Sequence, residues 1–211
     1  SGIGAATAAA LAAAGARVVV TEVDAGAAAS VAGALDGATA RALDVTSERD
    51  WAAALDDVRE RHGRLDVLVN NAGITAAAPL AEVDLEGWRR VMAVNVEGAL
   101  LGLRAAAPLL RVTRGCVVNV ASASGRKAQP GAAAYCTSKA ALLMLSRVAA
   151  LELAPQGVRV NCVLPGGVKT PMWEGMTFFR DLVAQTGGVE QAYASLASDT
   201  PLGRFCEPRE V

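Results

Sequence analysis

The sequence predicts an α/β protein built on a parallel β-sheet, and two observations carry this prediction. Short apolar runs rich in β-branched residues alternate along the chain with longer segments of helical periodicity. The apolar runs are nearly continuous, as in strands that are covered on both faces. The 211 residues, of which 53% are hydrophobic, are enough for one domain with a substantial core. We therefore expect a single three-layer α/β/α domain over residues 1–211.

The expected strands are the apolar runs, each short enough for one strand. Right-handed crossovers between them would bring every carboxyl end to the same edge of the sheet, where ligands bind in such folds. The runs are Arg17–Thr21, Leu65–Asn70, Cys116–Val120 and Val158–Leu164.

The expected helices lie between these runs. They are Ala5–Ala14, Ala25–Leu35, Glu48–His62, Leu85–Leu110 and Ala133–Leu153. In the last two, Ala and Leu occur on more than one face, which predicts a second packing partner besides the sheet. The segment Met172–Pro201 breaks the alternation and is expected to form one or two helices with loops.

Composition and charge argue against several classes of function. The 20 basic and 21 acidic residues give a net charge of −1, which provides no patch for nucleic acid or an anionic membrane. Neither a membrane-spanning apolar run nor a secretory signal is visible. Four widely spaced cysteines and the single His62 form no metal-binding pattern. We therefore expect free thiols, no metal and a cytoplasmic location.

A glycine-containing turn leads into the first helix. Gly2-Ile3-Gly4 would let the backbone approach a diphosphate, which the free N–H groups of the helix N-terminus would then bind. Glu22, at the end of the next strand, could accept hydrogen bonds from the ribose hydroxyls of an adenosine. Taken singly, the turn could be an ordinary one and Glu22 a solvated acid.

The strongest chemical signal is YCTSK at residues 135–139. Tyr135 and Lys139 are four positions apart and so share one helix face. A free tyrosine, with a pKa of about 10, is a poor acid or base at pH 7. A neighbouring ammonium favours the phenolate, and a positively charged nicotinamide ring would favour it further, so we expect these two cations to lower the pKa of Tyr135. A surface Tyr and Lys one turn apart would be the bland alternative.

YCTSK resembles the Tyr-x-x-Ser-Lys motif of the short-chain dehydrogenase/reductase family, and further motifs of that family follow in order. They are LDV at 43–45, NNAG at 70–73, NVEG at 95–98, VNVASASG at 118–125 and PGGVKTP at 165–171. Ser122 precedes Tyr135 by the separation typical of the family. In relatives a first strand feeds a longer glycine turn, so the resemblance implies that the first strand, and after EPREV the last strand, are missing from this Rossmann-like, doubly wound sheet.

The resemblance implies the roles of individual residues. Tyr135 would be the general acid or base, Ser122 would bind the substrate oxygen, and Lys139 would hold the nicotinamide ribose. Asn95 would fix a water that links Lys139 to solvent. Residues expected to line the NAD cofactor are Gly2, Ile3, Glu22, Asp44, Val45, Asn71, Ala72, Gly73, Tyr135, Lys139, Pro165, Gly166, Val168 and Thr170.

The implied activity is hydride transfer between NAD and a secondary alcohol or ketone. Two alternatives stay open: an NADPH-dependent reductase of 3-oxoacyl thioesters, and an NAD-binding subunit without turnover. The segment 172–201 would cover a substrate, and its Trp173, Met176, Phe178 and Phe179 favour an apolar or ring-bearing one, unless these side chains only anchor the segment. The family also implies a homo-oligomer, expected to be a tetramer, formed through the helices Leu85–Leu110 and Ala133–Leu153.

Overall fold

The structure is a computed structural model that describes residues 1–198 and 200–211. Its strands are β1 (Val19–Glu22), β2 (Thr39–Ala42), β3 (Val67–Asn70), β4 (Cys116–Val120) and β5 (Arg159–Val163), and all strand pairs are parallel. Its α-helices are α1 (Gly2–Ala13), α2 (Ala25–Gly33), α3 (Glu48–His62), α4 (Leu85–Met92), α5 (Gly98–Thr113), α6 (Ala133–Leu153), α7 (Pro171–Glu174), α8 (Thr177–Thr186) and α9 (Val189–Ala197). The predicted α/β class with parallel strands is confirmed.

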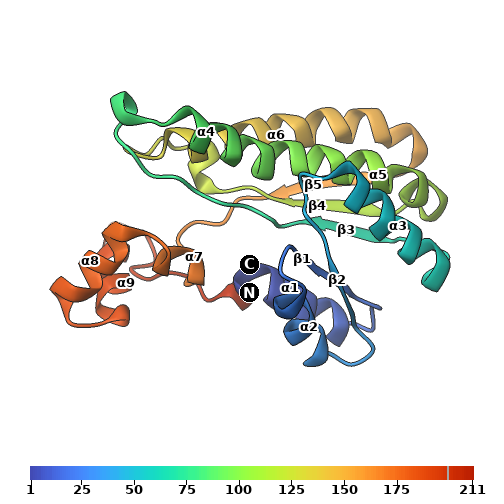
Figure 1. Cartoon of the computed structure of the whole chain (residues 1–211), viewed down its shortest axis with the longest axis horizontal. Helices are drawn as coiled ribbons and strands as arrows, with labels where there is room; N and C mark the ends of the chain where they lie inside the picture. The colour runs from blue at the N-terminus through green and yellow to red at the C-terminus, as the bar shows by residue number, and fades with distance from the viewer. Residues whose placement is uncertain (199) are drawn as a thin grey trace.

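The strands form two sheets, β1–β2 and β3–β4–β5. Helix α2 packs on β1 and β2, while α5 and α6 cover one face of β3–β5, with α3 and α4 beside them (Figure 1). In β5, Arg159 and Asn161 are exposed. This strand is therefore not buried on both faces as its apolar run predicted.

Strand β2 was missed by the sequence analysis. Of its residues, Thr39–Ala42, only the threonine favours strands, while the two alanines disfavour them. Pairing with β1 in parallel register, from Val19 opposite Thr39 to Glu22 opposite Ala42, makes it one. Tertiary pairing here outweighs local propensity.

Helix α3 shows why some boundaries could be predicted to the residue. The Ser47 side chain accepts a hydrogen bond from the Asp50 N–H at 3.2 Å, and Gly63 ends the helix with a φ of 68°. Trp51, Ala54 and Val58 form its buried face.

The predicted helix Leu85–Leu110 is instead three pieces. A π-helical turn, Ala93–Glu97, separates α4 from α5 and carries the buried Asn95. The combined stretch Leu85–Thr113 is long and apolar enough, by length and composition alone, to cross a membrane, although 44% of its most apolar window is buried in the protein. Its inner face lies in the main core, which Leu103, Leu110, Val117 and Val160 build between α5 and β3–β5. A buried core helix can have the same length and apolar composition.

The segment after β5 contains three helices, α7, α8 and α9, where one or two were predicted. In Figure 1 these helices, in orange, stand apart from the layers of the sheet. Phe179, Tyr193 and Phe205 form the centre of a separate apolar cluster there. Because Phe205 belongs to this cluster, the structural unit extends beyond the predicted boundary at residue 201. We call residues 171–205, apart from residue 199, the lid, after the substrate-covering role that the sequence analysis predicts for this segment.

Candidate active site

The site lies where strands β3, β4 and β5 end. Asn70 is paired with Asn119, and Asn119 with Cys162, so the three strands end at one edge of the sheet. The chain continues from these ends into the segments that carry Asn71, Ser122 and Pro165. Three segments distant in the sequence therefore meet at the carboxyl edge, as the parallel sheet predicts.

Ser122 and Tyr135 provide the hydroxyl groups of the site. Ser122 is buried, and its Oγ accepts a hydrogen bond from the Ser124 N–H at 3.1 Å, which holds the side chain in place. Tyr135 lies in the first turn of α6. Burial raises the pKa of Tyr135, and the hydrogen bond with the Ser122 side chain only partly opposes this.

The pKa of Tyr135 is thus shifted in the direction opposite to the one expected from a neighbouring ammonium. The reason is desolvation, since burial destabilises the phenolate by more than the hydrogen bond with Ser122 stabilises it. The Lys139 Nζ lies 5.7 Å from the centre of the Tyr135 ring, above the ring. That position is close enough for attraction but does not place the ammonium on the phenol oxygen.

Lys139 is the most perturbed base of the site. It is only 3% exposed, and its Nζ donates a hydrogen bond to the Val120 carbonyl at 2.8 Å. Burial lowers the pKa of Lys139 from 10.5 to about 8. Gly73 makes room for the amine, because a Cβ on this residue would lie 3.2 Å from the Nζ.

Asn95 is held by distant parts of the chain. Its Oδ1 accepts from the Ile74 N–H at 2.8 Å, and its Nδ2 donates to the Ile74 carbonyl at 2.9 Å and to the Ser138 Oγ at 2.9 Å. A Cβ on Gly73 would lie 3.5 Å from the Asn95 Oδ1, so the asparagine stands beside the Lys139 amine. The π-helical turn positions this residue next to α6.

A buried chain of polar groups beneath the site was not predicted. The Asn70 Nδ2 donates to the Asn119 Oδ1 at 2.8 Å, and the Asn119 Nδ2 donates to the Ser146 Oγ at 2.8 Å. Ser146 donates in turn to the Leu142 carbonyl at 2.6 Å. The chain ties β3, β4 and α6 together and so fixes the register of the elements that carry Ser122 and Lys139. The polar residues inside otherwise apolar strands were the signal that could have revealed it.

The predicted cofactor residues of three loops converge beside the start of α1. Gly2 has a φ of 53°, and a Cβ on it would lie 3.1 Å from the Thr170 Cγ2. A Cβ on Gly4 would lie 2.5 Å from the Asn71 Nδ2. These close approaches explain both glycines, and they leave backbone N–H groups at a helix start, as a cradle for a diphosphate requires.

A cavity of about 230 Å³ lies at the end of β5 and the loop that follows it. Pro165, Gly166 and Val168, all predicted to line the cofactor, form part of its wall together with Cys206 and Glu210. The residues present therefore fit a dinucleotide that extends from α1 to the loop after β5.

The remaining predicted residues lie at the ends of β1, β2 and β3. Glu22 is exposed at the end of β1, and its carboxylate accepts from the Val23 N–H at 2.9 Å. Asp44 accepts from the Thr46 N–H at 2.9 Å in a turn after β2. The Val45 carbonyl accepts from the Trp51 Nε1 at 2.9 Å. Ile3 lies in α1, and Ala72 lies in the loop that joins Asn71 to Gly73.

Comparisons with known proteins agree with this geometry. The family model described as enoyl-(acyl carrier protein) reductase matches residues 1–211. A cyclopentanol dehydrogenase of Comamonas testosteroni is 40% identical over 80% of the chain, and a cis-4-hydroxycyclohexanecarboxylate dehydrogenase of Sinomonas cyclohexanicum is 41% identical over the whole chain. The chain belongs to the short-chain dehydrogenase/reductase family. It spans 64% of the length of the first of these relatives and 82% of the second.

A solved structure supports the same assignment at the level of the fold. An NAD⁺-bound xylitol dehydrogenase superimposes with a TM-score of 0.86 at 32% identity, covering 99% of this chain and 84% of the other. The short-chain dehydrogenase/reductase fold is therefore retained, although the strands of this chain pair as two sheets.

Proposed function

We propose that the chain is the catalytic part of an NAD-dependent oxidoreductase that interconverts secondary alcohols and ketones. The observation that carries the proposal is the buried Lys139, whose amine stands between the Tyr135 ring, Asn95 and the loop at Gly73. A nearly inaccessible lysine costs stability, and active sites are where such groups occur. The two relatives are named as dehydrogenases of cyclic alcohols, and these names support the reaction class.

The protein groups then move one proton and orient the substrate. When bound, the nicotinamide accepts or supplies the hydride. During oxidation the alcohol O–H proton passes to the Tyr135 oxygen, and during reduction the Tyr135 phenol returns a proton to the ketone oxygen. Ser122 donates a hydrogen bond to the substrate oxygen, where negative charge develops. Lys139 stabilises the phenolate and, with Asn95, provides the route by which a proton leaves.

NAD, rather than NADP, is the proposed cofactor. Glu22 is exposed at the end of β1, where it can accept a hydrogen bond from a ribose 2′-hydroxyl, and a 2′-phosphate there would meet a like charge. The next residue, Val23, offers no compensating cation. The NAD⁺ in the structure of the xylitol dehydrogenase supports the same choice.

An apolar or ring-bearing alcohol is the proposed substrate class. The lid carries the partly buried Trp173 and Met176, and Phe178, which is 44% exposed, and we infer that this segment covers the substrate. Such a surface favours apolar rings. Cyclopentanol and cis-4-hydroxycyclohexanecarboxylate appear in the names of the relatives and are natural first compounds to test.

The enzyme is proposed to be cytoplasmic and a homotetramer. All four cysteines are free thiols, which suits a reducing compartment. Val112 of α5, and Met144, Val148 and Leu151 of α6, are exposed apolar side chains on the two helices predicted to need a second partner. Light scattering of the intact protein at micromolar concentration should give a mass above that of the monomer, and Val148→Glu should lower it.

Nicotinamide fluorescence during incubation with cyclic secondary alcohols tests the proposed activity. Tyr135→Phe keeps the ring but removes the oxygen that transfers the proton, so turnover should fall by about 10²–10⁴-fold while NAD⁺ affinity stays nearly constant. Reduction of a 3-oxoacyl thioester with NADPH, in preference to the alcohols with NAD⁺, would favour the first alternative activity. Cofactor binding without turnover of any compound would favour the non-catalytic subunit.

A further inference from the structure

The lid has an apolar core of its own. The ring centres of Phe179 and Tyr193 lie 4.9 Å apart, those of Tyr193 and Phe205 5.6 Å, and those of Trp173 and Phe205 5.2 Å. Phe179, Tyr193 and Phe205 are each at least 95% buried. The lid helices are therefore packed on one another, and their position relative to the rest of the fold depends on the segments that join them to it.

Two such segments run side by side. Val168 and Cys206 form a parallel bridge, in which the Cys206 N–H donates to the Gly167 carbonyl at 2.8 Å and the Lys169 N–H to the Cys206 carbonyl at 2.9 Å. The Phe205 ring lies so close to Gly167 that a Cβ there would collide with it. The lid is thus attached through the same loop that carries the cofactor residues Val168 and Thr170.

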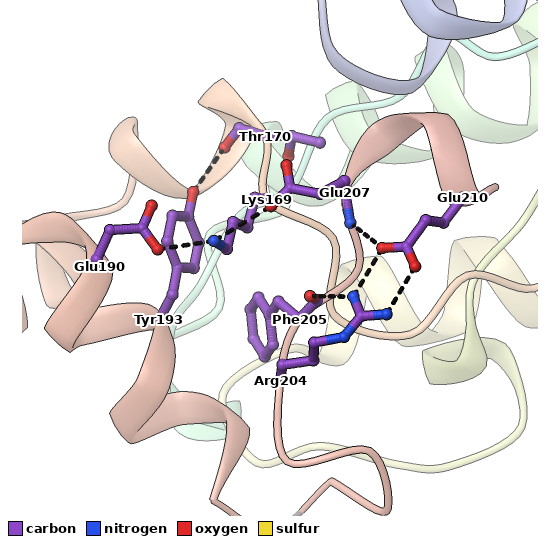
Figure 2. Close-up of polar contacts among 8 residues, drawn as sticks. All are labelled: Lys169, Thr170, Glu190, Tyr193, Arg204, Phe205, Glu207 and Glu210. Atoms are coloured by element: carbon purple, nitrogen blue, oxygen red, sulfur yellow. Dashed lines mark hydrogen bonds and ion pairs between the residues drawn. The ribbon is translucent and has the colours of Figure 1, made fainter.

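The Lys169 side chain links three elements at this attachment (Figure 2). Its Nζ lies 2.7 Å from the Glu190 Oε2, in the first turn of α9, and 3.2 Å from the Glu207 Oε1, next to the C-terminal 3₁₀ turn Pro208–Glu210. The same Nζ lies 5.9 Å from the centre of the Tyr193 ring. The Tyr193 hydroxyl donates to the Thr170 carbonyl at 3.3 Å, so α9 contacts both residues of the loop.

We propose that Lys169 is a positioning residue for substrate binding: it fixes helix α9 of the lid, and the C-terminal turn, to the loop that lines the nicotinamide site. This inference rests on the proposed function, because it assigns Lys169 a part in the binding of that substrate. The Lys169 side chain touches neither Ser122 nor Tyr135 in any contact of the structure, and it acts through Val168 and Thr170.

Lys169 can hold the two segments together because its one ammonium faces two carboxylates. Two carboxylates share one ammonium, and both raise the pKa of Lys169, with Glu190 the larger contributor. Arg204 and Glu210, 2.7 Å apart, form a separate pair beside them and do not neutralise the second carboxylate. Removing the ammonium would leave Glu190 and Glu207 facing each other, and their repulsion would separate α9 from the C-terminal turn.

Lys169→Met tests the proposal, since it keeps the length of the side chain and removes the charge. In the intact protein with NAD⁺, we expect the KM for a cyclic alcohol to rise about three- to ten-fold, with kcat changed less than about two-fold. Lys169→Arg should restore the KM to within about two-fold. Arg64→Met is the matched control, because it breaks an ion pair of similar length, 2.6 Å to Asp66, far from the lid.

Salt provides a readout that a purely steric role would not affect. Raising the ionic strength from about 0.1 M to about 1 M shortens the Debye length to about 3 Å. The KM of the wild type should then rise toward that of Lys169→Met, while the KM of the variant stays constant. Equal salt responses of wild type and variant would contradict an electrostatic role.

Hydrogen exchange separates this inference from the proposed activity. Amides of α9 should exchange about three- to ten-fold faster in Lys169→Met than in the wild type, whether or not the alcohol is a substrate. Unchanged exchange in α9 would overturn the inference even if the enzyme were an active dehydrogenase. Faster exchange with an unchanged KM would refute a role in substrate binding, and faster exchange in a protein without turnover would refute the proposed activity alone.

Discussion

Lys139 allows a quantitative test, because its burial makes the stability of the protein depend on pH. Its pKa falls from 10.5 to about 8 on folding, and at 1.36 kcal/mol per pKa unit this favours the neutral amine by about 3 kcal/mol. The folded state therefore binds fewer protons than the unfolded state between pH 8 and 10.5. The cost of the buried charge is fully present below pH 8 and disappears as the pH rises to 10.5.

The perturbation is Lys139→Met, which replaces the amine with an apolar group of similar length. The free energy of unfolding of the wild type, minus that of the variant, should increase by about 1.3 kcal/mol between pH 7 and pH 9. The size of the difference at any single pH is not the test, because the variant also leaves the Val120 carbonyl without its hydrogen bond. Only the change with pH reports the titration of Lys139.

Urea unfolding in the absence of NAD⁺, at several pH values from 7 to 10, measures this change. Lys127→Met, which removes an exposed lysine of the segment after Ser122, is the matched control and should show no such slope against pH. If the wild type and Lys139→Met differed by the same amount at every pH, the buried amine would have an ordinary pKa. The electrostatic description of the site would then be wrong.

Three further predictions follow from other contacts. Glu22→Ser combined with Val23→Arg should narrow or reverse a preference for NAD⁺ of about 10²-fold in kcat/KM, and equal use of both cofactors by the unmodified enzyme would disprove the role of Glu22. Gly102→Ala should lower the free energy of unfolding by about 1–3 kcal/mol in urea titrations, because the added Cβ would lie 2.7 Å from the Asn70 Oδ1 and 2.8 Å from the Trp51 ring. Arg204 lowers the pKa of Glu210 to about 2, so the stabilisation by this pair is present above the usual pKa of 4.5 and is lost as the pH falls through 2. The difference in Tm between the wild type and Arg204→Met should therefore shrink from pH 5 to pH 2. A difference that stays constant would show that Arg204 does not lower the pKa of Glu210.

The elements that the sequence predicted best are those whose own residues decide them. Helices α3 and α6 and strand β4 have the predicted bounds, since their apolar spacing or β-branched runs leave no competing structure. The π-helical turn at Asn95 was not visible, because its cause lies in Ile74 and Ser138, which are distant in the sequence. The same holds for β2, which exists through its pairing with β1.

The candidate site could be assembled from motifs, while its electrostatics could not. The spacing of Tyr135 and Lys139 predicted that the two side chains share a face of α6, and the ammonium does lie above the ring. The depth at which the pair is buried depends on how the β3 and β4 segments pack on α6, and no local pattern encodes that depth. The predicted lowering of the Tyr135 pKa, which counted the charges of both Lys139 and the nicotinamide ring, is opposed by this burial.

Burial acts on the two catalytic groups in opposite directions, and this defines what the residues do by themselves. It raises the pKa of Tyr135 and lowers that of Lys139 to about 8, so each group is driven toward its neutral form. A protonated phenol is ready to donate to a ketone oxygen, whereas accepting a proton from an alcohol first requires the phenolate. The Ser122 hydrogen bond and the charge of Lys139 both favour that phenolate. Burial outweighs the effect of the hydrogen bond, and it weakens the effect of Lys139 because it shifts the amine toward its neutral form. Desolvation therefore favours the protonated phenol of Tyr135, and the positive charge of Lys139 opposes this by favouring the phenolate.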